Sequence, residues 1–350
     1  MRREVVLGGA FAASIAAGIL HFAGAHAVVV FAVSGLALAG LAWVVGVATE
    51  AVGARFGPAA TGVLQSTLGN LPELFIVLFA LAAGELVVAR TAVLGSLFAN
   101  ALLVLGLAIV AGSMRARDGV MRFQTRLPND TATLLLLAVF IIALVGVSHE
   151  VDDPAAKHDV TISAICAVLL LSVYAVWLWG YLRPVQGVEP ALHEVAHPSI
   201  PFAWAVGLLA AAGVGAAFVS DWFVNALDPA VEALGISKAF TGIVIVAITG
   251  NAVENVVGIT LAAKGQNDLA ISVIKNSVAQ IAVFLFPALV LLSLFFEQRL
   301  TFVIGPVAIA ALVLMALSMW QITGDGEAAA FEGWALVALY LMVAVISWFE

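Results

Sequence analysis

Leu68-Gly69-Asn70-Leu71-Pro72-Glu73 is matched 181 residues later by Thr249-Gly250-Asn251-Ala252-Val253-Glu254. The same offset carries Ser96 onto Ser277, so each half of the chain holds a glutamate segment followed by a serine segment. Self-similarity of this kind indicates an internal structural repeat. The chain is therefore expected to contain two related halves, each built around one acidic motif.

The composition places both motifs in a membrane. Of the 350 residues, 63% are hydrophobic and only 10% are charged, and the mean hydropathy is +1.14. Soluble domains carry about 25% charged residues. Because backbone groups in lipid must satisfy their own hydrogen bonds, the apolar runs must form helices. We expect an all-α polytopic membrane protein without nucleic-acid partners, because a net charge of −8 gives no hint of a basic face.

About eleven apolar segments reach the roughly 20 residues that a membrane helix needs. Glu73 lies on the third of them and Glu254 on the eighth. The two motifs are thus five spans apart. Because this number is odd, they run in opposite directions through the bilayer, as in the inverted repeats of secondary transporters. The expected spans are residues 5–22, 27–52, 59–83, 86–111, 131–148, 160–182, 202–222, 237–263, 268–296, 301–320 and 330–348.

This pairing divides the chain into four parts. Residues 1–22 form an extra N-terminal helix, 27–182 the first five-helix inverted repeat, 183–199 a cytoplasmic connector, and 200–350 the second repeat. Lysine and arginine are more numerous on the N-terminal side of the membrane than on the opposite side, nine against four. By the positive-inside rule, the N-terminus is cytoplasmic and the C-terminus lies outside, in a multi-pass protein of the cell membrane.

Two intramembrane carboxylates favour a cation site. A carboxylate in hydrocarbon is costly and normally faces a polar pathway or a partner. Brought together by the repeat, Glu73 and Glu254 would be neutralised by one divalent ion or two protons. Asn70 and Asn251 precede them by three residues and so share their helix face. Coordination by carboxylate and amide oxygens suits a hard cation such as Ca²⁺.

Other polar and helix-breaking residues accompany the glutamates. Neighbouring spans offer neutral oxygens, while glycine or proline loosens the motif helices and frees backbone carbonyls as ligands. Taken alone, Ser96 and Asn100 are explained equally well as polar contacts between helices, and Asn70 and Asn251 are compatible with helix capping. The neutral candidates are Ser96, Asn100, Ser277 and Gln280, and the helix-breaking candidates are Gly69, Pro72 and Gly250.

These motifs resemble the cation/Ca²⁺ exchanger (CaCA) superfamily and, within it, the Ca²⁺/H⁺ antiporter (CAX) family. The resemblance covers nearly the whole chain and rests on Gly69–Leu74, Gly95–Asn100, Gly250–Asn255 and Ser277–Ala282. It implies that Glu73 and Glu254 alternately bind Ca²⁺ and protons, that Ca²⁺ is a transported substrate, and that no cofactor is needed. The surrounding ligands that it implies are Asn70, Asn251, Ser96, Ser277, Gln280 and Asn100.

The sequence departs from the sodium/calcium branch of that superfamily. That branch typically carries Thr-Ser before the glutamate and an extra aspartate in the second repeat. This chain has Gly-Asn and Ile281 at those positions, which favours proton over sodium coupling. Asn276 stands where a glycine is expected, after Lys275, whose side chain either snorkels or tunes the site. Na⁺/Ca²⁺ and Na⁺(K⁺)/H⁺ exchange stay open as alternatives.

Exchange follows from competition for the two carboxylates. With Ca²⁺ bound, both are ionised; without it, two neighbouring carboxylates in a low dielectric take up protons. Either loaded state is nearly neutral and can cross, whereas the empty, doubly charged state is trapped. The expected stoichiometry is about two protons per Ca²⁺. Alternating access would come from movement of one repeat against the rest.

His193-Glu194-Val195-Ala196-His197 spells the H-E-x-x-H signature of zinc metalloproteases. It lies in the connector, between Pro190 and Pro198, and not in a membrane helix. A membrane zinc metalloprotease is therefore the remote alternative, and a transporter, not an enzyme, is expected. The zinc content of the purified protein discriminates between them. A channel would use the same polar residues without obligatory exchange.

Overall fold

The computed structural model describes residues 3–53, 68–182 and 200–350. The connector, with the H-E-x-x-H motif, lies outside these residues, as does the start of the third expected span at 59–67. Within the described part, eight helices are long and apolar enough to cross a membrane, and a bent pair makes a ninth. Two shorter apolar helices, Val6–Phe22 and Leu71–Ala82, correspond to the first and third expected spans. The helical membrane architecture is confirmed.

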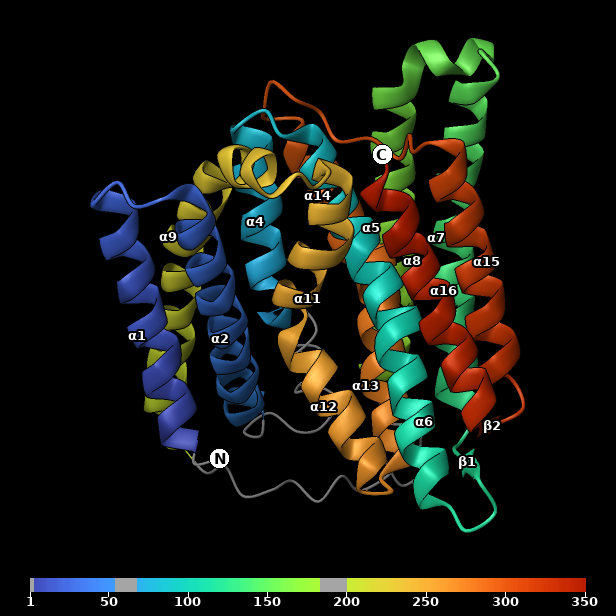
Figure 1. Cartoon of the computed structure of the whole chain (residues 1–350). Helices are drawn as coiled ribbons and strands as arrows, with labels where there is room; N and C mark the ends of the chain where they lie inside the picture. The colour runs from blue at the N-terminus through green and yellow to red at the C-terminus, as the bar shows by residue number, and fades with distance from the viewer. Residues whose placement is uncertain (1–2, 54–67, 183–199) are drawn as a thin grey trace.

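Three helices form one side of the molecule (Figure 1). They are α1 (Arg3–Phe22), α2 (Ala27–Gly53) and α9 (Phe202–Leu234). α2 packs along both α1 and α9. The rings of Phe31 and Phe223 stack between α2 and α9 at a centroid distance of 4.4 Å. These three helices therefore form one packed unit.

The remaining helices form the larger part of the bundle (Figure 1). Before the connector they are α4 (Leu71–Ala82), α5 (Leu86–Phe98), η1 (Ala99–Val104), α6 (Leu105–Arg115), α7 (Arg126–Glu150), η2 (Pro154–His158) and α8 (Asp159–Leu182). After α9 they are α10 (Lys238–Phe240), η3 (Thr241–Val246), α11 (Ala247–Gly250), α12 (Ala252–Ala263), α13 (Asn267–Gln280), η4 (Ile281–Leu285), α14 (Phe286–Ser293), α15 (Pro306–Thr323) and α16 (Ala330–Trp348).

Both serine-bearing spans contain a π-helical segment after the serine. α5, η1 and α6 together form the span 86–115, and α13, η4 and α14 form the span 267–293. Such segments are frequent at functional sites. α5 also packs closely on η3, because a Cβ on Gly95 would lie 2.5 Å from the Cα of Ile243. Only a glycine permits that approach of the two backbones.

A small antiparallel ribbon adds to the helices that the sequence predicted. Strand β1 (Val120–Arg122) pairs with β2 (Glu327–Ala329), and Met121 lies opposite Ala328. Three residues are too few for an alternating pattern to be recognised in the sequence. The ribbon joins the loop after α6 to the loop before α16.

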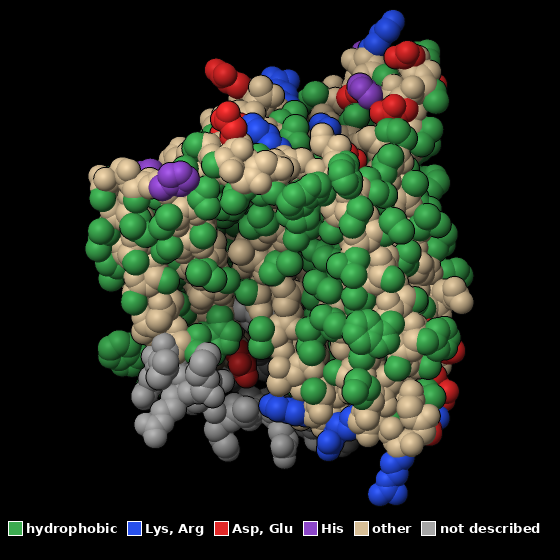
Figure 2. Space-filling view, viewed as in Figure 1, with side chains coloured by type: hydrophobic (Ala, Val, Ile, Leu, Met, Phe, Trp, Pro, Cys, Tyr) green, Lys and Arg blue, Asp and Glu red, His purple; other side chains and the backbone are tan. Residues whose placement is uncertain are grey.

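The surface has the distribution of side chains expected for a chain that spans a bilayer. Hydrophobic side chains cover the middle of the face in Figure 2, and charged side chains gather towards its two ends. Because the hydrocarbon core excludes unpaired charge, this band marks the part of the surface that faces lipid.

Candidate cation-binding site

Both motif glutamates stand in the first turn of a helix that begins after a break. Glu73 is the third residue of α4, and Glu254 is the third residue of α12. Asn70 (φ −84°, ψ 10°) and Asn251 (φ −97°, ψ 23°) precede these helices in non-helical conformations. The second-half span bends by 63° at this point. A helix N-terminus offers unpaired N–H groups and the positive end of the dipole, which both stabilise a carboxylate.

The breaks lie at the two asparagines, next to the residues that were expected to loosen the helices. α11 ends at Gly250. Pro72 is the second residue of α4, where its missing N–H costs no helical hydrogen bond. Val253 holds the corresponding place in the second half, so that break forms without a proline.

The motif glycines also provide space for the glutamate of the opposite half. A Cβ on Gly250 would lie 2.5 Å from Cγ of Glu73, and a Cβ on Gly69 would lie 3.2 Å from Oε1 of Glu254. These crossed contacts bring the two acidic motifs into one region of the bundle. The repeat thus places both acids at a shared site.

Glu73 is the centre of a buried hydrogen-bond network that joins the two halves. The hydroxyl of Ser96 and the side-chain amide of Asn251 both donate to Oε1 of Glu73. Asn251 also donates to the carbonyl oxygen of Ala247 at 2.9 Å. Asn100 donates to Oδ1 of Asn251 at 2.7 Å. Four of the predicted site residues are therefore brought into direct contact, and the side chain of Glu73 is only 3% exposed.

Three buried oxygens of predicted ligands have no hydrogen-bond partner among the described residues. They are Oε2 of Glu73, Oδ1 of Asn100 and Oγ of Ser277. Buried polar atoms in folded proteins are normally paired, so unpaired oxygens call for an explanation. Lone pairs on carboxylate, amide and hydroxyl oxygens are the ligands that a hard cation such as Ca²⁺ takes. The donor set around Glu73 therefore fits a cation.

The second glutamate has a different environment. Glu254 is partly exposed, whereas Glu73 is buried. Ser277 is the counterpart of Ser96, but its hydroxyl bonds to no described residue. Gln280 is buried at the end of α13. Asn70, the remaining predicted ligand, is also buried.

One polar residue beside the site was not among the predicted ligands. Asn255 follows Glu254 directly, and its Oδ1 is buried without a partner in the described part of the chain. Its Nδ2 donates to the carbonyl oxygen of Ile248, across the break, at 3.4 Å. The sequence contained a sign of it: the corresponding residue of the first half is the apolar Leu74, so Asn255 is an extra polar residue beside the second glutamate.

Lys275 is directed to α15 and bonds to neither carboxylate. Its side chain is buried, and Nζ donates to Oγ1 of Thr323 at 2.6 Å. Thr323 in turn donates to the carbonyl oxygen of Met319 at 2.7 Å, at the C-terminal end of α15. The negative end of a helix dipole favours a cation at this position.

Comparisons with known proteins agree with this architecture. The model of the sodium/calcium exchanger protein family matches residues 26–182 and 204–349. The Ca²⁺/H⁺ antiporter of Synechocystis sp. (strain ATCC 27184 / PCC 6803 / Kazusa) is 33% identical, over 94% of this chain and 93% of that protein. The Ca²⁺/H⁺ antiporter ChaA of Bacillus subtilis (strain 168) is 31% identical, over 95% of this chain and 94% of its own length.

The solved structure of native YfkE is similar in fold, with a TM-score of 0.80. The two share 28% sequence identity, and the match covers 99% of each chain. The family match includes both acidic motifs, one in each of its two segments. This multi-pass membrane protein belongs to the sodium/calcium exchanger protein family.

Proposed function

We propose that the chain is a secondary active transporter that exchanges Ca²⁺ for H⁺ by alternating access. The observation that carries the proposal is the crossed pair of acidic helix N-termini, in which each glutamate packs against the motif glycine of the other half. Two carboxylates at one site are neutralised by one Ca²⁺ or by two protons. The names of the relatives in Synechocystis and Bacillus subtilis support the choice of these two substrates.

The two oxygens of Glu73 have separate roles in this mechanism. Oε1 already accepts from Ser96 and Asn251, whereas Oε2 has no described partner. Oε2 is therefore the atom at which a proton and Ca²⁺ compete. Asn251 belongs to the second half and lies at the helix break that precedes Glu254. Because Asn251 donates a hydrogen bond to Glu73, binding of a proton or Ca²⁺ at Glu73 directly affects the conformation of that break. Ser277, Gln280, Asn100 and Asn70 complete the ligand set in this proposal.

The position that distinguishes the sodium-coupled branch is apolar here. Ile281 is fully buried at the start of η4 and contributes no side-chain oxygen. The site accordingly has two carboxylates and not three, which favours proton over sodium coupling. Na⁺/Ca²⁺ and Na⁺(K⁺)/H⁺ exchange are the competing functions within the same family.

The division of the chain and its orientation belong to the same proposal. An extra helix at 1–22 precedes inverted repeats at 27–182 and 200–350, joined by a cytoplasmic connector at 183–199. The two segments matched by the family model, 26–182 and 204–349, support this division. The excess of lysine and arginine on the N-terminal side supports a cytoplasmic N-terminus and an external C-terminus.

Flux measurements in proteoliposomes test the proposal. The purified protein is reconstituted, a pH gradient is imposed, and Ca²⁺ movement is followed with and without Na⁺. The proposal predicts Ca²⁺ accumulation on the acidic side, because protons leaving that compartment drive Ca²⁺ into it, at a rate that Na⁺ does not change. Ca²⁺ movement that requires Na⁺ and does not depend on the pH gradient would contradict the proposal and favour Na⁺/Ca²⁺ exchange.

A control substitution distinguishes loss of the cation site from the general effect of removing one negative charge. Glu327→Gln removes an exposed carboxylate of β2 that pairs with Arg122 at 3.1 Å. This variant should exchange at the wild-type rate. Gradient-driven flux that is equally weakened by Glu327→Gln and by Glu73→Gln would contradict the assigned site.

A further inference from the structure

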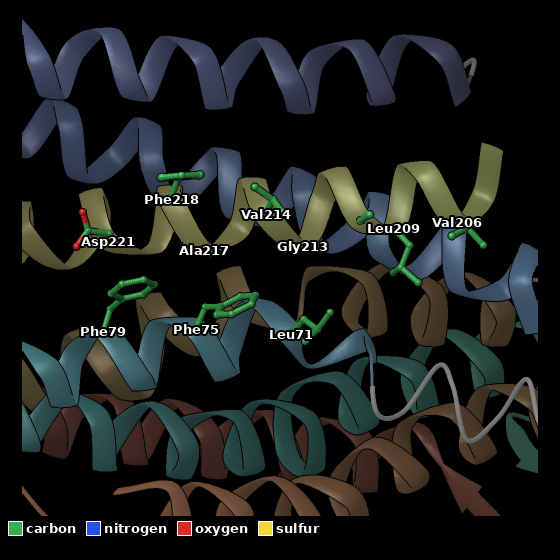
Figure 3. A pocket seen from close by; sticks show the side chains of 11 residues that line it. Leu71, Phe75, Phe79, Val206, Leu209, Gly213, Val214, Ala217, Phe218 and Asp221 are labelled. Carbon is green, nitrogen blue, oxygen red and sulfur yellow. The ribbon is translucent and has the colours of Figure 1, made fainter. Parts of the chain in front are cut away.

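A groove of about 760 Å³ runs between α4 and α9 (Figure 3). Its size is that of pockets which hold small organic ligands. One stripe of side chains from each helix forms its walls. The stripe on α4 is Leu71, Phe75 and Phe79; that on α9 is Val206, Leu209, Ala210, Gly213, Val214, Ala217, Phe218 and Asp221.

Small residues on α9 create the space. A Cβ placed on Gly213 would meet only Leu71 Cδ1, at 4.0 Å, so the middle of the groove stays open. Leu71 also begins the helix that carries Glu73. The groove therefore reaches the residue two positions before Glu73, although its walls there are apolar.

The groove opens onto the lipid-facing surface. Val214 and Phe218 are each 59% exposed, in the apolar middle of a helix that spans the membrane. The rings of His21 and Phe22 lie 6.0 Å from that of Trp222, the neighbour of Asp221. Aromatic clusters of this kind mark the membrane–water interface.

The groove follows much of the membrane-spanning length of α9. Its lining on that helix runs from Val206 to Asp221, fifteen residues further on, which is about 22 Å of helix at 1.5 Å per residue. This length fits within the roughly 30 Å hydrocarbon core. An apolar channel of this length, open to lipid along its side and with Asp221 at one end, has the shape of an acyl-chain site.

Asp221 gives the groove a charged end. It is the one ionisable side chain in the lining, lies beside Phe79 and Phe218 (Figure 3), and forms no ion pair with another described residue. A carboxylate at the interface attracts an ammonium group and repels a headgroup whose net charge is negative. A quaternary ammonium cannot donate a hydrogen bond to it, whereas a primary ammonium can.

We propose that this groove binds a phospholipid with a primary-amine headgroup, with one acyl chain between α4 and α9 and the ammonium at Asp221. The occupant is a zwitterionic lipid of the phosphatidylethanolamine class. Its chain would lie between the helix that carries Glu73 and the helix that packs along α2. The site is thus separate from the cation ligands and does not depend on which cation is carried.

Lipid retention by the purified full-length protein tests this proposal. The protein is equilibrated with equal amounts of phosphatidylethanolamine and phosphatidylcholine of identical acyl chains, and bound lipids are counted by native mass spectrometry. The wild type should prefer phosphatidylethanolamine by about two- to fivefold, the effect expected of one ion pair near water. Asp221→Asn should abolish the preference while chain binding persists.

Gly213→Phe fills the groove and should remove the bound lipid of both classes. Gly207→Phe is the matched control on α9, because a Cβ there meets nothing within 4 Å and the residue does not line the groove. It should retain the wild-type lipid count. Equal retention of both lipids by the wild type, or a preference that survives Asp221→Asn, would overturn the proposal. Asp221→Asn gives this answer even if Gly213→Phe fails to fold.

Discussion

The two helix breaks share a sequence motif but have different surroundings. Glu73 is buried, and Ser96 and Asn251 both donate to its Oε1. Glu254 is partly exposed, and the hydroxyl of Ser277 bonds to no described residue. A repeated sequence therefore produces one carboxylate that is buried in a hydrogen-bond network and one that is partly exposed. In an exchanger with alternating access, this asymmetry is what a single state should display.

The largest effect is expected from the carboxylates themselves. Glu73→Gln and Glu254→Gln each remove one of the two charges that neutralise Ca²⁺, and each leaves a neutral side chain of the same shape. Both variants should lose exchange by about two orders of magnitude or more, because an unpaired charge in the membrane costs at least about 2.5 kcal/mol. Initial rates of Ca²⁺ flux in proteoliposomes measure this. Near-wild-type flux in either variant would remove that residue from the site.

The two glycines should differ when each is replaced by alanine. The added methyl of Gly250→Ala falls 2.5 Å from Cγ of buried Glu73, whereas that of Gly69→Ala falls 3.2 Å from an oxygen at the end of Glu254. Overpacking costs about 1–3 kcal/mol, so Gly250→Ala should reduce exchange about tenfold and Gly69→Ala by less. Flux assays at matched protein density compare them. Equal rates for the two variants would contradict the crossed contacts.

Replacing Ser96 or Ser277 by alanine should also have different effects on Ca²⁺ affinity. Ser96→Ala removes a buried donor from Glu73, which costs about 1–3 kcal/mol and should weaken apparent Ca²⁺ affinity by about tenfold. Ser277→Ala removes one neutral ligand oxygen of the proposed set but breaks no hydrogen bond to a described residue. Its loss should weaken the affinity by only about threefold, or about 0.6 kcal/mol. Calorimetric Ca²⁺ titration tests the difference, and a reversed order would mean that the network around Glu73 is not the one that holds the cation.

The smallest effect on transport is expected at Lys275. Its counterpart in the first half is the buried Leu94, so Lys275→Leu makes the two halves more alike. Exchange should stay within about twofold, because Nζ bonds to Thr323 and not to a carboxylate. Replacing a buried ionisable group by a hydrophobic one is often neutral or stabilising, so Tm should not fall. Loss of exchange in a protein with unchanged Tm would show instead that Lys275 tunes the site.

Much of the fold could be predicted because lipid imposes strict rules on sequence. Apolar runs must form helices, and the offset of 181 residues pairs Glu73 with Glu254. The same pattern identified Ser96, Asn100 and Asn251, which the structure brings into contact with one another. The three-residue strands β1 and β2 were missed, because no periodicity can be read from so short a segment.

Other features depend on tertiary contacts that a motif does not display. Gly69 and Gly250 were predicted to loosen the helices, and nothing in the sequence indicated that they also contact the glutamates of the opposite half. The difference between Ser96 and Ser277 could not be foreseen, since a repeated sequence predicts symmetry and a single conformation need not be symmetric. The groove beside Gly213 likewise arises only when α9 lies against α4.

Proton-linked Ca²⁺ binding tests the central claim most directly. Equilibrium binding is measured over a pH series on wild type, Glu73→Gln and Glu254→Gln. If both carboxylates release a proton when Ca²⁺ binds, the apparent Kd should weaken as pH falls, by about a hundredfold per unit in the range where both are protonated. Each single variant should show only about a tenfold change per unit. A pH dependence that is the same in all three proteins would contradict a site shared by Glu73 and Glu254.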